Sequence, residues 1–537
     1  MSSLAMKRTH RFPLRSIALA AQLVAVGILA ACGGDDDETP VDNGAVPLTV
    51  PKVASCAAGG VAESGLQGQV PAALRASGFK GFNCNLSLVG QLQGEGGNWS
   101  TASFTDGAGR SCAYHATAVP NANRVNPGVP VIDITDRTKP LRTTSLTTPS
   151  MTDPWESLRI NQRRQFLIAD NGQNGGGGPE VDLYDVSGDC RSPQLLSTLA
   201  VGTGTDGGIV PTNSPIGHEG NISPDGLTYY VGDLRNAAYY AVDVANTTKP
   251  KMISAINMSA VVPGSNVHGL SISNDGNRVY AVVLGGPAFG APPAIVDPAH
   301  PSNGFVIFDT SEVQQRLPNA QMKVVSTALF QDGSVAQHTI PAKIGDKQYL
   351  IMVDEGGSAG LANDAAAQVA CNAGLSPFPM ARIYDISDEK NPKPVSKLML
   401  ETHDPKNCSQ VIPDIAGLSI FTYGSHYCTV DNRDNTTALA CSYFNSGIRV
   451  FDIRDPERPK EIAYYNPPSA ATAQAGSSHA VFGQWKAGGP DWCASRLDFD
   501  LAKKQIVTMC QDNGLIVLQF APDTWPFATS TASTSQN

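Results

Sequence analysis

The chain has 537 residues, of which 41% are hydrophobic and 16% charged; 38 basic and 48 acidic residues give a net charge of −10. This composition is typical of a globular protein with a large core. The one strongly apolar run, residues 17–31, is shorter than the roughly 20 residues of a bilayer span, which excludes a polytopic membrane protein. Because no basic run lies beyond it, nucleic acid and anionic membrane surfaces are poor partners.

Residues 1–31 combine basic residues with the apolar run and end in Leu29-Ala30-Ala31, directly before Cys32. This segment resembles bacterial lipoprotein signal peptides, in which the cysteine thiol accepts a diacylglycerol after cleavage. An ordinary secretory signal is the alternative. The residue after Cys32 is Gly33, whereas Asp at that position is the inner-membrane retention signal of such lipoproteins. The resemblance therefore implies an outer membrane lipoprotein of a Gram-negative bacterium, which touches the membrane through its lipid anchor only.

The segment after the lipobox has a different composition. Residues 32–55 contain an acidic run and several prolines, so we expect a disordered tether. Ten cysteines follow Cys32, and an even number in an oxidising compartment predicts up to five disulfides. Metal binding by thiolates is the weaker interpretation, because the chain has no CxxC motif and no zinc-like cysteine spacing. Cys56 and Cys84 delimit an N-terminal segment, residues 56–84, and form one expected pair.

An internal repeat indicates the fold. Six times an apolar strand ends in an Asp that is followed some residues later by a Pro, and these acids are Asp133, Asp185, Asp243, Asp309, Asp385 and Asp452. Residues 514–520 form a seventh, degenerate copy. Each copy ends a three-strand pattern with alternating apolar residues and turns such as Ser223-Pro224-Asp225-Gly226, and a fourth short strand follows the Pro. Four strands per repeat is the pattern of a propeller blade.

The repeated strand, which reads VPVIDITD, ARIYDISD and IRVFDIRD, resembles the LVIVD-repeat family of β-propellers. We therefore expect an all-β, seven-bladed propeller over residues 85–521, with a C-terminal tail over 522–537. Residues 86–92 resemble a fourth strand that precedes the first unit, and the last unit lacks one, so the N-terminal strand should close the last blade. The repeated Asp is most simply structural, since its carboxylate can accept backbone N–H groups of the following turn.

The cysteines of the last two blades are placed so that each pair can form a disulfide across a hairpin. Cys428 and Cys441 are symmetric about the turn at residues 434–435, so they should face each other across antiparallel strands within disulfide reach. Cys493 and Cys510 span the analogous hairpin of the last blade. Cys371 and Cys408 form a further expected pair, between loops.

Aligned on their first turns, four consecutive units place a histidine at the start of the innermost strand. These residues are His218, His268, His338 and His426, and the second unit has Glu156 in the same position. Since the inner strands surround the axis, the side chains are candidate metal ligands. The second strands should end at the same face, with the candidate ligand-binding residues Asp170, Asp233, Asp354, Glu355 and Asp512. Long insertions should also emerge there, which marks this as the working face.

Neutral imidazole binds copper, zinc or iron, and ligands from separate blades can form one rigid site. The propellers of the selenium-binding protein and methanethiol oxidase family, which this chain resembles in architecture and in axial histidines, are thought to use copper. Nitrous oxide reductase likewise holds copper with histidines at a propeller hub. This resemblance favours copper as the divalent ion. The alternative is that the histidines only bind backbone carbonyls or water.

Two functions from different classes follow. The first is an envelope-anchored propeller that binds an unidentified ligand or protein partner through its histidine-bearing face, with or without a metal. The second is a metal-dependent, copper-type oxidoreductase that uses the same face. Three tryptophans precede inner strands, namely Trp99, Trp155 and Trp492, and could form the floor of a ligand site. Core packing is the commoner role of such residues.

Overall fold

The computed structural model describes residues 41–42, 48–49, 51–118, 123–172, 180–201, 217–286, 292–297, 301–418, 420–483, 485–525 and 527. The predicted signal peptide, Cys32 and most of the predicted C-terminal tail lie outside these residues. Among the residues that the structure does describe, no helix is long and apolar enough to cross a membrane.

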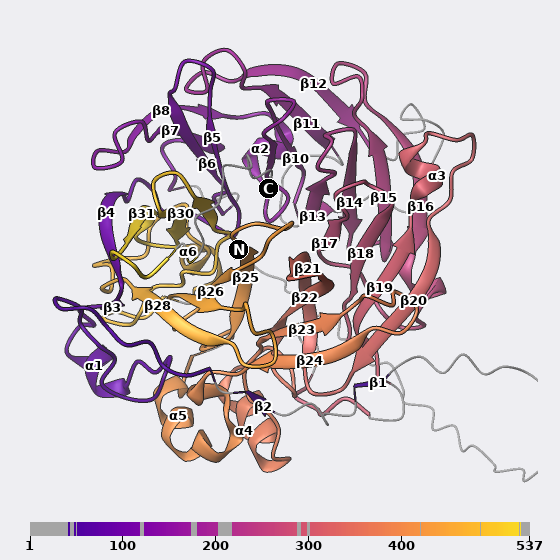
Figure 1. Ribbon diagram of the computed structural model, residues 1–537. Coiled ribbons are helices and arrows are strands. Elements are labelled where there is room, and N and C mark those ends of the chain that lie inside the picture. The colour runs from indigo at the N-terminus through magenta and orange to yellow at the C-terminus, as the bar shows by residue number, and fades with distance from the viewer. Residues whose placement is uncertain are drawn as a thin grey trace, which may run out of the picture. The chain divides into compact units, whose positions relative to one another are not determined.

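Seven four-stranded antiparallel blades form the fold, as predicted (Figure 1). Blade 1 contains β5 (Thr101–Thr105), β6 (Ser111–His115), β7 (Val129–Asp133) and β8 (Leu141–Leu146). Blade 2 contains β9 (Arg159–Asn161), β10 (Phe166–Asp170), β11 (Glu180–Asp185) and β12 (Gln194–Ala200). Blade 3 contains β13 (Gly217–Ile222), β14 (Thr228–Asp233), β15 (Ala238–Asp243) and β16 (Lys251–Asn257). Blade 4 contains β17 (Leu270–Ile272), β18 (Arg278–Val283), β19 (Asn303–Asp309) and β20 (Lys323–Phe330).

The remaining blades follow the same order. Blade 5 contains β21 (Ser334–Ile344), β22 (Lys347–Gly356), β23 (Ala381–Asp385) and β24 (Lys393–Leu398). Blade 6 contains β25 (Ser425–Val430), β26 (Ala438–Tyr443), β27 (Ile448–Asp452) and β28 (Lys460–Asn466). Blade 7 contains β29 (Asp498–Asp500), β30 (Gln505–Cys510), β31 (Gly514–Phe520) and β4 (Leu86–Leu92). Each first-named strand is innermost, and it contacts the innermost strands of both neighbouring blades around a complete ring.

Blade 7 closes the ring with strands from both ends of the propeller sequence. β4 pairs antiparallel with β31, with Gly90 opposite Val517 and Leu88 opposite Leu518. A Cβ at Gly90 would lie 2.0 Å from the backbone oxygen of Arg137, so only glycine allows this approach. The expected closure by an N-terminal strand is therefore present.

Side chains of each blade pack against both neighbouring blades because successive residues of a strand point to opposite faces. On β22, Leu350 and Met352 pack into a cluster with residues of blade 4, whereas Ile351 and Val353 pack into a cluster with residues of blade 6. All four are fully buried, which explains why the second strand of a blade reads as a continuous apolar run.

The repeated Asp residues terminate the third strands. Each carboxylate accepts the backbone N–H of the residue two positions later, at 2.8–3.1 Å, and these acids are Asp133, Asp185, Asp243, Asp309, Asp385 and Asp452. This geometry is an Asx turn. The structural interpretation of the repeat is confirmed.

Short strands of the N-terminal region extend three blades by a fifth strand, which the sequence did not suggest. β1 (Val41–Asp42) pairs parallel with β20, and β2 (Leu48–Thr49) pairs parallel with β24. Both lie in the segment that we expected to be a tether. β3 (Phe82–Cys84) adds an antiparallel edge strand to β28 of blade 6.

The helices lie between strands, and most are short. They are α1 (Ala72–Ala76), α2 (Pro149–Thr152), α3 (Ser311–Gln314), α4 (Asp364–Asn372), α5 (Cys408–Ile415), α6 (Ser478–Phe482), and the 3₁₀ turns η1 (Met258–Ala260), η2 (Glu401–His403) and η3 (Pro405–Asn407). α4 and α5, the two longest, lie in insertions of blades 5 and 6, contact each other and are joined by a disulfide.

Five disulfides use all ten described cysteines. They are Cys56–Cys84, Cys112–Cys190, Cys371–Cys408, Cys428–Cys441 and Cys493–Cys510. Cys428 lies directly opposite Cys441 across β25 and β26, with 4.0 Å between the Cα atoms, in the register that the hairpin symmetry predicts. Because every one of these thiols is oxidised, none can serve as a thiolate ligand.

Candidate metal centre at the propeller axis

Five buried side chains with nitrogen or carboxylate donors converge on the axis, and we call them the hub. They are Glu156, His218, His268, Glu355 and His426. His218 is in β13 and His426 in β25, whereas Glu156 and His268 lie just before β9 and β17. Glu355, at the end of β22, is the one member from a second strand. The inner strands of four blades, or the residues just before them, therefore supply four of the five donors, as the alignment of the units suggested.

Glu156 is at the centre of the hub. Its Oε2 lies 3.9 Å from Nε2 of His218 and 3.6 Å from Nε2 of His268, and its Oε1 lies 3.4 Å from Nε2 of His426. Glu355 lies on the other side, 3.2 Å from His426 and 3.9 Å from His268. Two groups of three donors, which share Glu156, are each compact enough to hold an ion.

Backbone carbonyls orient two of the imidazoles. Nδ1 of His268 lies 3.0 Å from the carbonyl oxygen of Gln337, and Nδ1 of His426 lies 2.5 Å from that of Ala494. Since a carbonyl only accepts, each ring carries a proton on Nδ1 and, when neutral, offers the lone pair of Nε2 to the hub. Metal-binding histidines are held in this way by a second set of contacts.

The acids and imidazoles of the hub shift one another's pKa. Burial lowers the pKa of His426, but the carboxylates of Glu156 and Glu355 outweigh it and raise the value to about 10. Burial also lowers the pKa of His268, but the carboxylates of Glu156, Glu219 and Glu355 outweigh burial and raise it. Burial and the neighbouring His268 instead lower the pKa of His218 to about 3. Two carboxylates thus attract positive charge to a buried site.

His338 is not part of the hub, although it aligns with the other three histidines. β21 has a bulge after Ala336, as β13 has after Gly217 and β25 has after Ser425. The residue that directly follows is His218 in β13 and His426 in β25, but Gln337 in β21. His338 is one residue further along and therefore points to the other side. Gln337 takes the axial position, where its Nε2 donates to Oε2 of Glu156 at 2.9 Å. His338 instead packs on the Tyr427 ring, at 4.7 Å, and contacts the backbone of Cys428.

Four of the five acids expected at the ends of second strands have other partners. Asp170 accepts the Tyr229 hydroxyl at 2.9 Å, and Asp233 accepts that of Tyr240 at 2.9 Å. Asp354 pairs with the Arg382 guanidinium at 3.0 Å. Asp512 lies 2.5 Å from Nδ1 of His479. Glu355 is thus the only one of the five predicted acids that faces the hub.

Aromatic side chains cover the hub on the side where the inner strands begin. Trp99 lies 5.1 Å from the ring of His426 and 6.2 Å from that of Trp155, which in turn lies 5.8 Å from His218. These tryptophans form one buried cluster with Phe444, Trp492 and neighbouring apolar residues. They act as core packing, and they close the hub toward the face of the insertions, which the sequence pattern predicts to be the working face.

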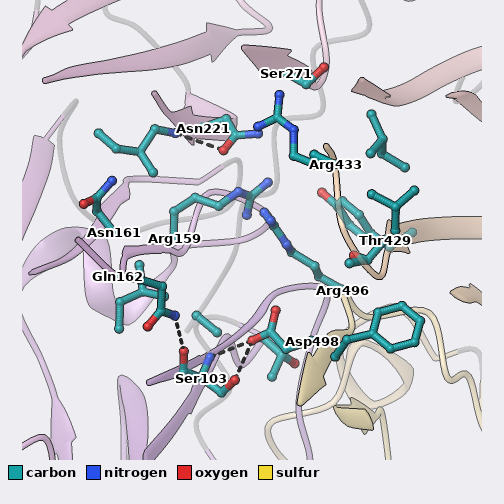
Figure 2. Close-up of a pocket in the computed structure, with 18 of the residues that line it drawn as sticks. Ser103, Arg159, Asn161, Gln162, Asn221, Ser271, Thr429, Arg433, Arg496 and Asp498 are labelled. Atoms are coloured by element: carbon teal, nitrogen blue, oxygen red, sulfur yellow. Dashed lines mark hydrogen bonds between the residues drawn. The ribbon is translucent and has the colours of Figure 1, made fainter. Parts of the chain in front are cut away.

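A cavity of about 810 Å³ lies on the other side of the hub, among the ends of the inner strands and their tight turns (Figure 2). Glu219, His338 and Tyr427 line it. Tyr427 donates its hydroxyl to Oε2 of Glu156 at 3.0 Å, so this tyrosine belongs to the cavity wall and contacts the hub. The open space therefore approaches the hub from the face with short turns.

A second buried donor group lies away from the axis. His479, Asp491 and Asp512 offer donors close enough for one ion, and the His479 ring packs on Trp492 at 4.4 Å. Burial and the neighbouring Asp512 raise the pKa of Asp491 to about 7. Sequence analysis named Asp512 but not its two partners, because His479 and Asp491 lie in an insertion where no repeat position marks them.

Comparison with known proteins finds only solved structures of low similarity. No family model and no curated protein matches it. A periplasmic gluconolactonase of Pseudomonas aeruginosa superposes with a TM-score of 0.46 and 12% identity, over 75% of this chain and 91% of the other. A protein from Lactobacillus plantarum gives 0.43 and 10%, over 76% and 88%. The Cps50 (Swd1) propeller domain of Myceliophteria thermophila gives 0.44 and 9%, over 81% and 99%.

Proposed function

We propose that this propeller binds a divalent transition-metal ion at its hub, through Glu156, His218, His268, His426 and Glu355. The observation that carries the proposal is the orientation of His268 and His426. Their Nδ1–H groups are held by backbone carbonyls, and both Nε2 atoms lie within 3.6 Å of Glu156. The Gln337 amide nitrogen also lies 2.8 Å from Nε2 of His426, so a metal ion there would displace this contact. Three imidazoles and two carboxylates suit copper or zinc, and copper is the ion that such nitrogen-rich sites bind most tightly.

The charge balance supports a divalent ion. Glu219, the third carboxylate near the axis, already pairs with Arg159 at 2.8 Å, and both are buried. Glu156 and Glu355 are then the two acids without a buried cation beside them, and the groups around them are imidazoles, the Gln337 amide and the Tyr427 hydroxyl. One divalent cation compensates both carboxylates with the imidazoles neutral, whereas the metal-free hub needs protons on the imidazoles.

Metal content and affinity of the full-length chain test the proposal. We expect at least one equivalent of copper or zinc by mass spectrometry after growth in supplemented medium, and affinity that falls as pH falls, because protons compete for Nε2. His268→Ala, His426→Ala and Glu156→Gln should each weaken binding at least tenfold.

His338→Gln is the matched control for these variants. It removes a buried imidazole of the same alignment position that faces away from the hub, so metal affinity should be unchanged. A chain without metal that binds none in calorimetric titration at pH 7 contradicts the proposal. So does a loss in His338→Gln equal to that in His268→Ala.

In the cell, we propose that the propeller is held at the outer membrane of a Gram-negative bacterium by a lipid on Cys32 and binds its ligand there. The lipobox-like residues before Cys32 support this location. A metal-dependent oxidoreductase is the second candidate, since the cavity reaches Tyr427, which contacts Glu156. Reversible reduction of copper in the hub, followed by electron paramagnetic resonance, would favour the second candidate over simple binding.

A further inference from the structure

Three arginines meet in the cavity below the hub. Figure 2 shows the guanidinium groups of Arg159 and Arg496 directed toward each other, whereas that of Arg433 lies on another side of the open space, next to Asn221. They come from the inner strand of blade 2, the first turn of blade 6 and the segment before the inner strand of blade 7. Like charges repel, so this convergence needs a physical reason.

Only one of the three has an acidic partner. Arg159 pairs with Glu219 at 2.8 Å. Arg433 donates to the backbone oxygen of Ile272, and its Nε is buried with no hydrogen-bond partner. Asp498, the acid nearest in sequence to Arg496, is occupied by the backbone N–H and hydroxyl of Ser103, at 2.7 and 2.9 Å. In the described part of the chain, no acid lies within ion-pair distance of Arg433 or Arg496.

The cavity as a whole has an excess of positive charge. Five cationic and three acidic side chains line it, which leaves two positive charges in a chain whose net charge is −10. Burial lowers the pKa of both Arg433 and Arg496 to about 10, with Arg159 contributing for Arg496, yet both stay charged at pH 7. Charged groups removed from water without a counterion are costly, so a protein retains them where an anion binds.

The remaining lining determines the size and character of the occupant. A volume of about 810 Å³ is within the range of organic ligand sites and far larger than one inorganic phosphate needs. Apolar side chains such as Ile160, Leu270 and Phe499 share the wall with the amides of Asn161 and Asn221. The wall thus offers apolar contact and hydrogen bonds beside the two cations.

We propose that this cavity binds an organic anion, with its carboxylate or phosphate group at the guanidinium groups of Arg433 and Arg496, which lack acidic partners, and its carbon skeleton against the apolar wall. Guanidinium groups form paired hydrogen bonds to both kinds of oxyanion. The proposal does not depend on a metal in the hub, because neither arginine contacts a hub residue among the interactions that the structure records.

Calorimetric titration of the full-length chain with three probes tests it. Benzoate and phenyl phosphate carry the two candidate oxyanions on one ring, and benzyl alcohol is the neutral counterpart. We expect at least one anion to bind at least tenfold more tightly than benzyl alcohol, with and without a metal chelator. Tighter binding of phenyl phosphate assigns a phosphate ligand, and tighter binding of benzoate assigns a carboxylate.

Variants separate the site from general charge effects. Arg433→Gln and Arg496→Gln should each weaken anion binding at least tenfold, whereas Arg458→Gln, which removes an exposed charge outside the cavity, should not. Arg496→Gln should also raise the melting temperature of the ligand-free chain, since it removes an uncompensated charge; a purely structural arginine would lower it. Equal binding of benzyl alcohol, absence of anion binding, or full affinity in Arg496→Gln overturns the proposal.

Discussion

Asp170 is a buried carboxyl group at the end of β10. Burial raises its pKa to about 8, and Glu219 and Asp233 add to this, although the Tyr229 hydroxyl and Arg159 favour the charged form. In the folded chain the group therefore keeps its proton up to about pH 8, whereas an unfolded aspartate loses it near pH 4. The stability that this difference contributes is complete below pH 4 and is lost as pH rises through 8.

Asp170→Asn should remove that dependence, because the amide does not titrate and its oxygen can still accept from Tyr229. The free energy of unfolding of the native chain, relative to that of the variant, should fall by about 2 kcal/mol or more between pH 5 and pH 8. Denaturant titrations of both proteins at these two pH values measure it. Parallel pH profiles would show that the carboxyl group is ionised in the fold.

For single residues of the hub, the alignment of the inner strands predicts that Glu156, His218, His268 and His426 lie close together, and in the structure they do. It could not distinguish Gln337 from His338, because the strand between the bulge and the first turn is longer in blade 5 than in blades 3 and 6, and the sequence does not mark the bulge. Glu355 and the four other predicted acids all end second strands, so the sequence gives no reason to prefer one of them. Only their three-dimensional neighbours show that Glu355 faces the hub.

At the scale of the elements, two disulfides close loops of very different length. Cys112–Cys190 joins blade 1 to blade 2 across 78 residues, whereas Cys428–Cys441 closes 13 residues within one hairpin. All four cysteines are buried, so their replacement by alanine leaves comparable cavities. Longer loops lose more entropy on closure, which predicts that removing Cys112–Cys190 costs about 1.6 kcal/mol more.

Denaturant unfolding of the two double alanine variants checks this order. A larger loss of stability in the Cys428→Ala, Cys441→Ala variant would mean that local packing outweighs loop entropy.

Strand alternation and turn residues made the blades themselves predictable from the sequence. The edge strands β1 and β2 were not, because two residues carry no periodicity and parallel pairing to a distant strand leaves no local signal.

For the whole molecule, the proposed location depends on Cys32. Cys32→Ser should move the full-length protein from the membrane fraction to the soluble fraction, since the lipid is its only expected anchor. Gly33→Asp keeps the lipid and should move the protein to the inner membrane instead. Cell fractionation with an antibody to the propeller measures both. Membrane association of Cys32→Ser that resists salt would contradict lipid anchoring.

The closure of blade 7 has a consequence for synthesis. Gln91 and Asn513, which are hydrogen-bonded where β4 meets β31, are 422 residues apart. The first blade strand therefore stays unpaired until the last described strand has been synthesised. Any chain that stops before Gly514 leaves β4 without its partner and exposes two unpaired strand edges, which favours aggregation. Closure of the ring therefore depends on β31, and a product truncated before this strand cannot form the ring.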